Sequence, residues 1–188
     1  MKYKSIIRKC LIVFFFFSIF TLFISANTAY YPASIQSGSP VIDGNIDELW
    51  SGAEWESINK LIFNNTGMET IPSRRYKALF DDQAVYFLVD VEDDSVESDN
   101  YDYLYNDSVT LFFDFGNEKK DYTDDNDYQF SFSYGQEDIY SRESTGLPGV
   151  SHQWSLTDRG YILEIAVRVR DIKRQNDIIG FDIFINDI

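Results

Sequence analysis

Three tyrosines, Tyr101, Tyr103 and Tyr105, stand at every second position of one strongly acidic stretch of the chain. An aromatic ring offers a flat apolar surface to one face of a sugar ring, and neighbouring carboxylate and amide groups can hydrogen-bond its hydroxyls. The pattern therefore predicts a carbohydrate-binding loop, with a tyrosine-rich cover over the end of the fold as the alternative. Trp154 is a further candidate for ligand contact, and packing in the core is its alternative role.

Clustered acids indicate a second kind of site, one for a cation. Calcium takes about six to eight oxygen ligands from carboxylates, carbonyls and water. Two groups of acids could converge: Asp114, Asp124, Asp125 and Asp127, and, in an earlier loop, Asp93, Asp94, Asp99 and Asp107. Neither group has the fixed spacing of an EF-hand loop. We predict a structural Ca2+ site on the first group, with solvated acidic loops as the alternative.

The same residues give little indication of a catalytic site. Glycoside hydrolysis needs two carboxylates at a set separation, and with 31 acidic residues some pair meets that condition by chance. Glu164 alternates with apolar neighbours and is predicted to lie on the outer, solvent-facing side of a strand. His152 is the only histidine, so histidine metal sites and Ser-His-Asp triads are disfavoured. We expect no enzyme activity from this chain.

The elements that must position these residues are strands. Residues 76–94 hold two apolar runs around a short polar break, and in the second run Val85, Phe87, Val89 and Val91 fall on one side. A period of two with such a break predicts a β-hairpin with a buried face.

The same alternation returns in residues 109–115, 128–134, 161–169 and 181–185. Many short strands separated by turn signals predict an all-β fold, an antiparallel β-sandwich of jelly-roll-like form.

One short helical turn is expected before the hairpin. Asp47 stands where it could cap a helix, and Leu49, Trp50 and Ala53 follow at near-helical spacing. We expect this turn to pack Trp50 against the sheet. Trp55 is also assigned to the core.

The first residues are not part of the domain. Four basic residues precede an apolar run that ends in small residues near position 29, as in a secretory signal peptide, with an uncleaved N-terminal anchor as the alternative. We therefore expect a signal peptide over 1–29, a lead-in segment over 30–40 and one sandwich domain over 41–188. The protein is expected to be secreted, to the periplasm or outside the cell. The single cysteine, Cys10, lies in the signal, so the mature chain has no thiol.

Net charge restricts the partners. The whole chain carries −15, and loss of the signal removes four of 16 basic residues and none of 31 acidic ones, which leaves −19. Such a domain repels nucleic-acid phosphates and anionic lipid. We expect no nucleic acid and, after cleavage, no membrane among its partners.

Several phrases of the chain together resemble carbohydrate-binding module family 9. They occur in the family's order and are IDGNIDELW (42–50), YKALFDDQAVYFLVDVEDDSV (76–96), NDSVTLFFDFGN (106–117), DDNDYQF (124–130), GYILEIAV (160–167) and IGFDIFIND (179–187). The resemblance implies a non-catalytic domain that binds polysaccharide or oligosaccharide. It also implies association with a glycoside hydrolase and, often, structural calcium.

The chain departs from the family where binding residues are expected. Leu104 stands in place of a stacking tryptophan, Thr110 in place of an acid, and Ser131 in place of an arginine. The family's second stacking tryptophan and further strands would follow Ile188, so the chain resembles the family without its C-terminal part. A structural or adhesion sandwich with no sugar site is the alternative function.

A haem-binding relative is a third alternative, since related sandwiches hold haem through a pair of axial side chains. Met68 and His152 are the attractive ligands of the chain for this role. An exposed methionine and a surface histidine are the competing explanation.

Overall fold

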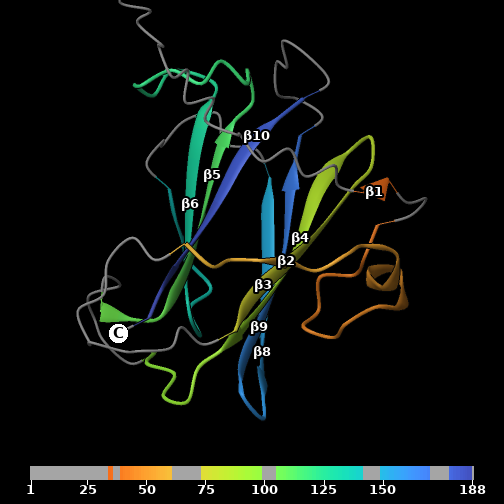
Figure 1. The fold of residues 1–188 in the computed structure, drawn as a ribbon, viewed down its shortest axis with the longest axis vertical. Helices are drawn as coiled ribbons and strands as arrows, with labels where there is room; N and C mark the ends of the chain where they lie inside the picture. Colours follow the sequence, from red (N-terminus) through yellow and green to blue (C-terminus); the bar gives the residue numbers. More distant parts are fainter. Residues whose placement is uncertain are drawn as a thin grey trace, which may run out of the picture. The chain divides into compact units, whose positions relative to one another are not determined.

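A computed structural model describes residues 34–35, 39–60, 73–98, 105–141, 149–169 and 178–187. All of them belong to one compact unit, Pro32–Ile188. The described part of this unit is all-β, with strands in two sheets and one short 3-10 helix (Figure 1). In the described part of the chain, no helix has both the length and the apolar character that crossing a membrane demands.

The first sheet has the strand order β1-β3-β4-β9-β8, with β2 pairing to β3. These strands are β1 (Ser34–Ile35), β2 (Glu56–Ser57), β3 (Arg74–Phe80), β4 (Ala84–Glu92), β8 (Val150–Thr157) and β9 (Gly160–Arg168). Neighbours run antiparallel except for β1, which pairs with β3 in parallel. The predicted antiparallel pairing is therefore confirmed, and the two-residue β1 is the exception at this edge.

The second sheet has the order β10-β5-β6-β7 and is antiparallel throughout. Its strands are β5 (Ser108–Asp114), β6 (Asp127–Ser133), β7 (Ile139–Ser141) and β10 (Gly180–Asn186). In Figure 1 its labelled strands β5, β6 and β10 form a group of arrows separate from that of β3, β4, β8 and β9.

One apolar core joins the two sheets. Alternate residues of β4, β5, β6, β9 and β10 turn inward and are almost wholly buried. The core includes Phe87, Val89, Leu111, Phe130, Phe132, Leu163, Ile165 and Ile183. Full burial of one such side chain contributes about 2 kcal/mol. The inward faces predicted from the period of two are confirmed.

The predicted hairpin is β3 and β4, and Asp81 holds its turn. Asp81 Oδ1 accepts the backbone N–H groups of Gln83 (2.8 Å) and Ala84 (2.9 Å), while Oδ2 accepts the Tyr86 hydroxyl (2.9 Å). A short acidic side chain that bonds its own turn is the usual reason for Asp at such a position. Burial is the largest influence on the pKa of Asp81 and would raise it, but these bonds together with one from Ser39 bring it below its ordinary value.

The first sheet is also covered on its outer face. The 3-10 helix η1 (Glu48–Gly52) lays Trp50 against Tyr86, Leu88 and Ile162 in a second apolar cluster. The predicted role of Trp50 is confirmed, since only 1% of it is exposed. Asp47 does occupy the N-cap position, but its side chain makes no capping bond there.

Glu164 corrects the sequence expectation. It is not a surface residue but is fully buried, because the Trp50 segment covers the outer face of β9. Its carboxylate accepts the Trp50 indole N–H (2.9 Å) and the backbone N–H groups of Gly44 (2.9 Å) and Asp43 (3.2 Å). The alternation of apolar and polar residues correctly predicted the face of the strand on which Glu164 lies. It could not predict that a segment far away in the sequence covers that face.

Candidate functional site

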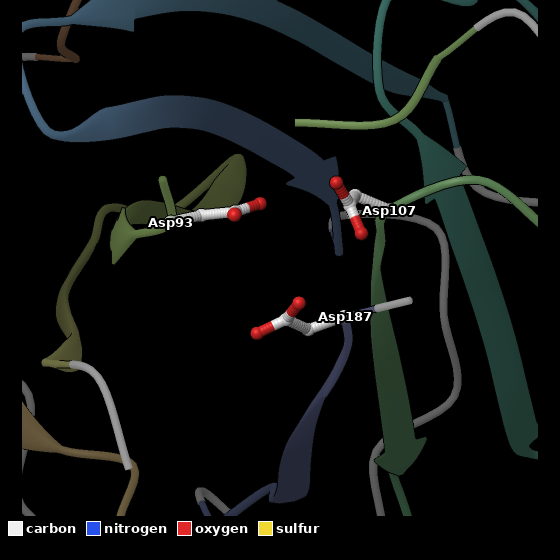
Figure 2. Close-up of side chains that lie close together, drawn as sticks. All are labelled: Asp93, Asp107 and Asp187. Atoms are coloured by element: carbon white, nitrogen blue, oxygen red, sulfur yellow. The ribbon is translucent and has the colours of Figure 1, made fainter. Parts of the chain in front are cut away.

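Three carboxylates meet at one end of the two sheets. Asp93 directly follows β4, Asp107 directly precedes β5, and Asp187 directly follows β10. One oxygen from each lies within 4.8 Å of the others. Figure 2 shows the three side chains directed toward a common space from separate strand ends. We call this group the Asp93–Asp107–Asp187 cluster.

Strand pairing explains the meeting. In the antiparallel β10–β5 ladder Asn186 pairs with Ser108. The residue after Asn186, Asp187, therefore lies beside the residue before Ser108, Asp107. Asp93 is held by its backbone N–H, which donates to the Arg159 carbonyl at 2.8 Å. The cluster therefore links one strand of the first sheet with two strands of the second.

Three buried polar atoms in or beside the cluster have no hydrogen-bond partner in the described part of the chain. They are Asp93 Oδ2, the hydroxyl of Tyr161 and Nε of Arg74, the residue that pairs with Asp187. Asp93 is 9% exposed and Tyr161 is fully buried. Burial raises the pKa of Tyr161, and the negative charges of Asp107 and Asp93 raise it further. A buried polar atom without a partner costs about 1–3 kcal/mol, so such atoms indicate a missing partner.

The charges of the cluster are only partly balanced. Arg74 forms an ion pair with Asp187. Burial is the main influence on the Asp187 pKa and raises it, while the Arg74 charge acts in the opposite direction. Three carboxylates and one guanidinium leave a formal charge of −2, which a divalent cation matches. The donors are oxygens, which calcium prefers.

The sequence identified part of this cluster. Asp93 and Asp107 stood in the second predicted acidic group, whereas Asp94 is exposed and Asp99 lies outside the described residues. Asp187 was missed, because it is far away along the chain. The signal that could have found it is the pairing of the last strand beside β5.

The first predicted acidic group takes a different form. Asp114 and Asp127 face each other at the ends of β5 and β6, and Asp124 forms an ion pair with Lys120. Asp125 is exposed. Among the described residues, the group of acids close enough to share one ion is the Asp93–Asp107–Asp187 cluster. A calcium role for Asp114, Asp124, Asp125 and Asp127 stays a prediction.

The predicted sugar-contact residues are only partly described. Tyr105 precedes β5 and is 57% exposed, while Tyr101 and Tyr103 lie outside the described residues. Trp154 lies at the edge of the core, edge-on to Tyr134 and Tyr161 with ring centroids 5.2 and 5.4 Å apart. This contact corresponds to the alternative role of Trp154, packing in the core. Its role in ligand contact stays a prediction.

Two of the positions where the chain departs from the family lie side by side. Thr110 and Ser131 are register partners of β5 and β6, and their hydroxyl oxygens are 2.8 Å apart. Both are buried, at 7% and 9% exposure. Here two short neutral side chains stand where the resemblance implies an acid and an arginine. Leu104 lies outside the described residues.

Of the two haem-ligand candidates, the described one is His152. Its Nε2 lies 3.0 Å from the Gln136 carbonyl oxygen, and its ring packs against Phe132. Met68 lies outside the described residues.

Comparison with known proteins agrees with this geometry. Residues 42–188 match the model of a family described as "Carbohydrate family 9 binding domain-like". Two solved structures are similar, both of a carbohydrate binding module family 9 from Caldicellulosiruptor kristjanssonii. One, in complex with glucose, has a TM-score of 0.67 at 25% identity, over 83% of this chain and 78% of that one. The other, in complex with cellotriose, has a TM-score of 0.66 at 25% identity, over 80% and 73%.

Longer relatives contain a similar segment. Endo-1,4-beta-xylanase A of Thermoanaerobacterium saccharolyticum is 32% identical over 174 residues, 87% of this chain and 15% of that protein. Exoglucanase XynX of Acetivibrio thermocellus is 33% identical, over 86% and 15%. Endo-1,4-beta-xylanase A of Thermotoga maritima is 34% identical, over 82% and 14%. The chain thus spans a small part of the length of these relatives.

Proposed function

We propose that this chain, which belongs to the carbohydrate family 9 binding domain-like family, binds polysaccharide or oligosaccharide without acting on it. The observation that carries the proposal is the family match over residues 42–188. It is supported by the similar structures that hold glucose and cellotriose. The family is one of binding modules, so this region is a non-catalytic domain.

The sugar contact is assigned to the tyrosines of the 101–105 loop. Tyr105 supports this assignment, because it lies three residues before β5 and is 57% exposed to solvent. A phenol ring buries apolar sugar surface on its face while its hydroxyl stays in water. The loop then supplies stacking where the family's tryptophan is replaced by Leu104.

The biological setting follows from the relatives and from the start of the chain. Xylanases and an exoglucanase carry a similar segment. We therefore place this domain beside a glycoside hydrolase, as an anchor that holds the enzyme on its polymer. Residues 1–29 have the pattern of a signal peptide, so the domain works outside the cytoplasm.

A calcium ion is assigned to the Asp93–Asp107–Asp187 cluster. The unpartnered Asp93 Oδ2, the formal charge of −2 and the oxygen donors all fit such an ion. When bound, calcium supplies a cross-link between the ends of β4, β5 and β10. Its role is structural, since it would join the two sheets at one end.

Affinity gel electrophoresis tests the binding proposal. The full chain is run in gels that contain hydroxyethylcellulose, soluble xylan or no glycan, beside Tyr105→Ala and the control Leu156→Ala. We expect retardation of the wild type by a neutral glycan and a loss of affinity of about ten-fold for Tyr105→Ala. Leu156 is 68% exposed on β8, so its replacement should leave binding unchanged.

The opposite outcome has a clear meaning. A wild-type chain that melts cooperatively and is retarded by no glycan would support the structural or adhesion alternative. A chain that binds but loses nothing in Tyr105→Ala would move the stacking surface away from that residue.

A further inference from the structure

Among the described residues, the outer face of the second sheet carries three exposed aromatic side chains: Phe112 of β5, Phe184 of β10 and Tyr140 of β7. Phe112 is an outward residue of β5 and is 40% exposed. The other outward residues of this strand are Ser108, Thr110 and Asp114. An exposed phenylalanine in an otherwise polar row costs hydration free energy and contributes nothing to the core. Exposed apolar surface of this kind marks a contact site when polar groups surround it.

Polar groups do flank Phe112 on both sides. The sheet register places Asp182 of β10 and Gln129 of β6 directly opposite it. Neighbouring strands lie about 4.8 Å apart, so a carboxylate and an amide stand one strand away on either side of the ring. An aromatic surface between a hydrogen-bond acceptor and an amide suits a sugar ring, which has apolar faces and a rim of hydroxyls.

A pocket of about 690 Å³ adjoins this row. Phe112, Gln129 and Asp182 form part of its lining, and the loop between β5 and β6 contributes Tyr122, which is 63% exposed. The volume lies within the range of small-ligand sites. Asp114 also lines it and has a buried Oδ1 with no hydrogen-bond partner among the described residues. We call it the Phe112 pocket.

Charge selects the class of ligand. The pocket lining includes the acids Asp114, Glu118, Asp121, Asp127 and Asp182. The one cation among the described lining residues, Lys120, is already paired with Glu118 and Asp124. A surface of this sign repels uronic-acid and sulfated glycans. The pocket therefore fits a neutral saccharide.

We propose that the Phe112 pocket holds a ring of a neutral polysaccharide chain, as a second contact apart from the 101–105 loop. Ser108 and Asp114 mark opposite ends of β5, about 20 Å apart at the usual rise per residue. Tyr105 lies near the first end and the pocket near the second. A chain that reaches both would be held at two points, and its affinity would rise by the effective-concentration advantage. This inference rests on the proposed function, since it concerns the same ligand.

The test compares ligand length in the full chain. Isothermal titration calorimetry is run with glucose and with cellohexaose on wild type, Phe112→Ala, Gln129→Ala and the control Leu156→Ala. We expect cellohexaose to bind the wild type much more tightly than glucose. Phe112→Ala should reduce the affinity for cellohexaose about ten-fold and that for glucose by less, because a single ring can also bind at the 101–105 loop. Gln129→Ala should show a smaller loss with the same dependence on length.

Each outcome decides a separate point. Wild-type affinity for cellohexaose in both folded pocket variants would overturn the Phe112 pocket and leave the proposed function standing. Binding of polygalacturonate as strong as that of a neutral glycan would overturn the assigned ligand class. No binding of either ligand by the wild type, together with no retardation in the glycan gels, would remove the proposed function, and the pocket assignment with it.

Discussion

The indole Nε1–H of Trp50 donates a hydrogen bond of 2.9 Å to Oε1 of Glu164, a residue 114 positions later in the chain. Both side chains are almost completely buried. The other carboxylate oxygen accepts the backbone N–H groups of Asp43 and Gly44. Burial raises the pKa of Glu164, and these bonds partly offset the rise. One carboxylate thus fastens the whole 43–50 segment to the middle of the first sheet.

Glu164→Ala should destabilise the domain by about 3 kcal/mol. The substitution leaves the Trp50 indole N–H and two backbone N–H groups buried without an acceptor. Urea denaturation followed by tryptophan fluorescence measures the change. Glu137→Ala is the control, since Glu137 is exposed and its loss should change stability by less than about 0.5 kcal/mol. Equal stability of the two variants would contradict the anchoring role.

Gly160→Ala should also destabilise strongly, by about 3 kcal/mol or more. Gly160 is the first residue of β9 and has φ of +141°, and an added Cβ would lie 2.1 Å from the Val91 carbonyl oxygen. Both the backbone conformation and the contact oppose any side chain here.

Gly149→Ala is the matched control for that change. There the nearest atom to an added Cβ is in the Arg168 side chain, at 3.5 Å, an ordinary contact. Thermal unfolding by circular dichroism should separate the two variants by many degrees. A Gly160→Ala melting curve equal to that of Gly149→Ala would show that the turn can adapt.

Calcium should raise the melting temperature of the wild type and much less that of Asp93→Asn. A ligand that binds only the folded state stabilises it by about 2.7 kcal/mol at a hundred times its Kd. Asp93→Asn removes one ligand charge from the cluster, while Asp94→Asn changes an exposed neighbour outside it. Melting curves with CaCl2 and with EDTA give the comparison. Equal calcium shifts in both variants would place the ion elsewhere, with the Asp114 group as the next candidate.

The calcium effect should shrink on mild acidification. Burial raises the pKa of Asp187 above its ordinary value, so protons compete with calcium earlier than they would at an exposed carboxylate. Without calcium, acidification has the opposite effect and stabilises the folded state, because the Asp187 carboxyl binds its proton more tightly in the folded state than in the unfolded state. Its contribution to stability then grows as pH falls from the raised pKa to the ordinary one, about 3.9.

The measurement is the difference between melting temperatures with and without calcium, at about pH 7 and about pH 5. Asp187→Asn is the informative variant, because it removes the titrating group while keeping an oxygen ligand. A calcium shift that is the same at both pH values in the wild type would contradict a role for a carboxylate with raised pKa.

Sequence reasoning succeeded where a short stretch carries the information. The alternation around Phe87 predicted which face of β4 is buried, and the short polar break predicted the hairpin that Asp81 holds. It failed where a strand is covered by a segment that lies far away in the sequence. Glu164 looks like a surface residue within its own strand, and only the packing of Trp50 across that strand buries it.

The candidate site divides in the same way. Asp93 and Asp107 could be grouped because they flank one acidic loop, whereas Asp187 joined them through the β10–β5 register. Phe112 could be placed on a strand, but its neighbours Asp182 and Gln129 come from two other strands.

The sequence by itself therefore determined the fold class, the buried faces of the strands and the position of Trp50, since the period of two and the spacing of a helical turn are local properties of a chain. Only the tertiary structure decided which acids meet, which glutamate is buried and which polar groups flank Phe112. The physical reason is that strand order brings together residues far apart along the chain, and no local pattern encodes that order.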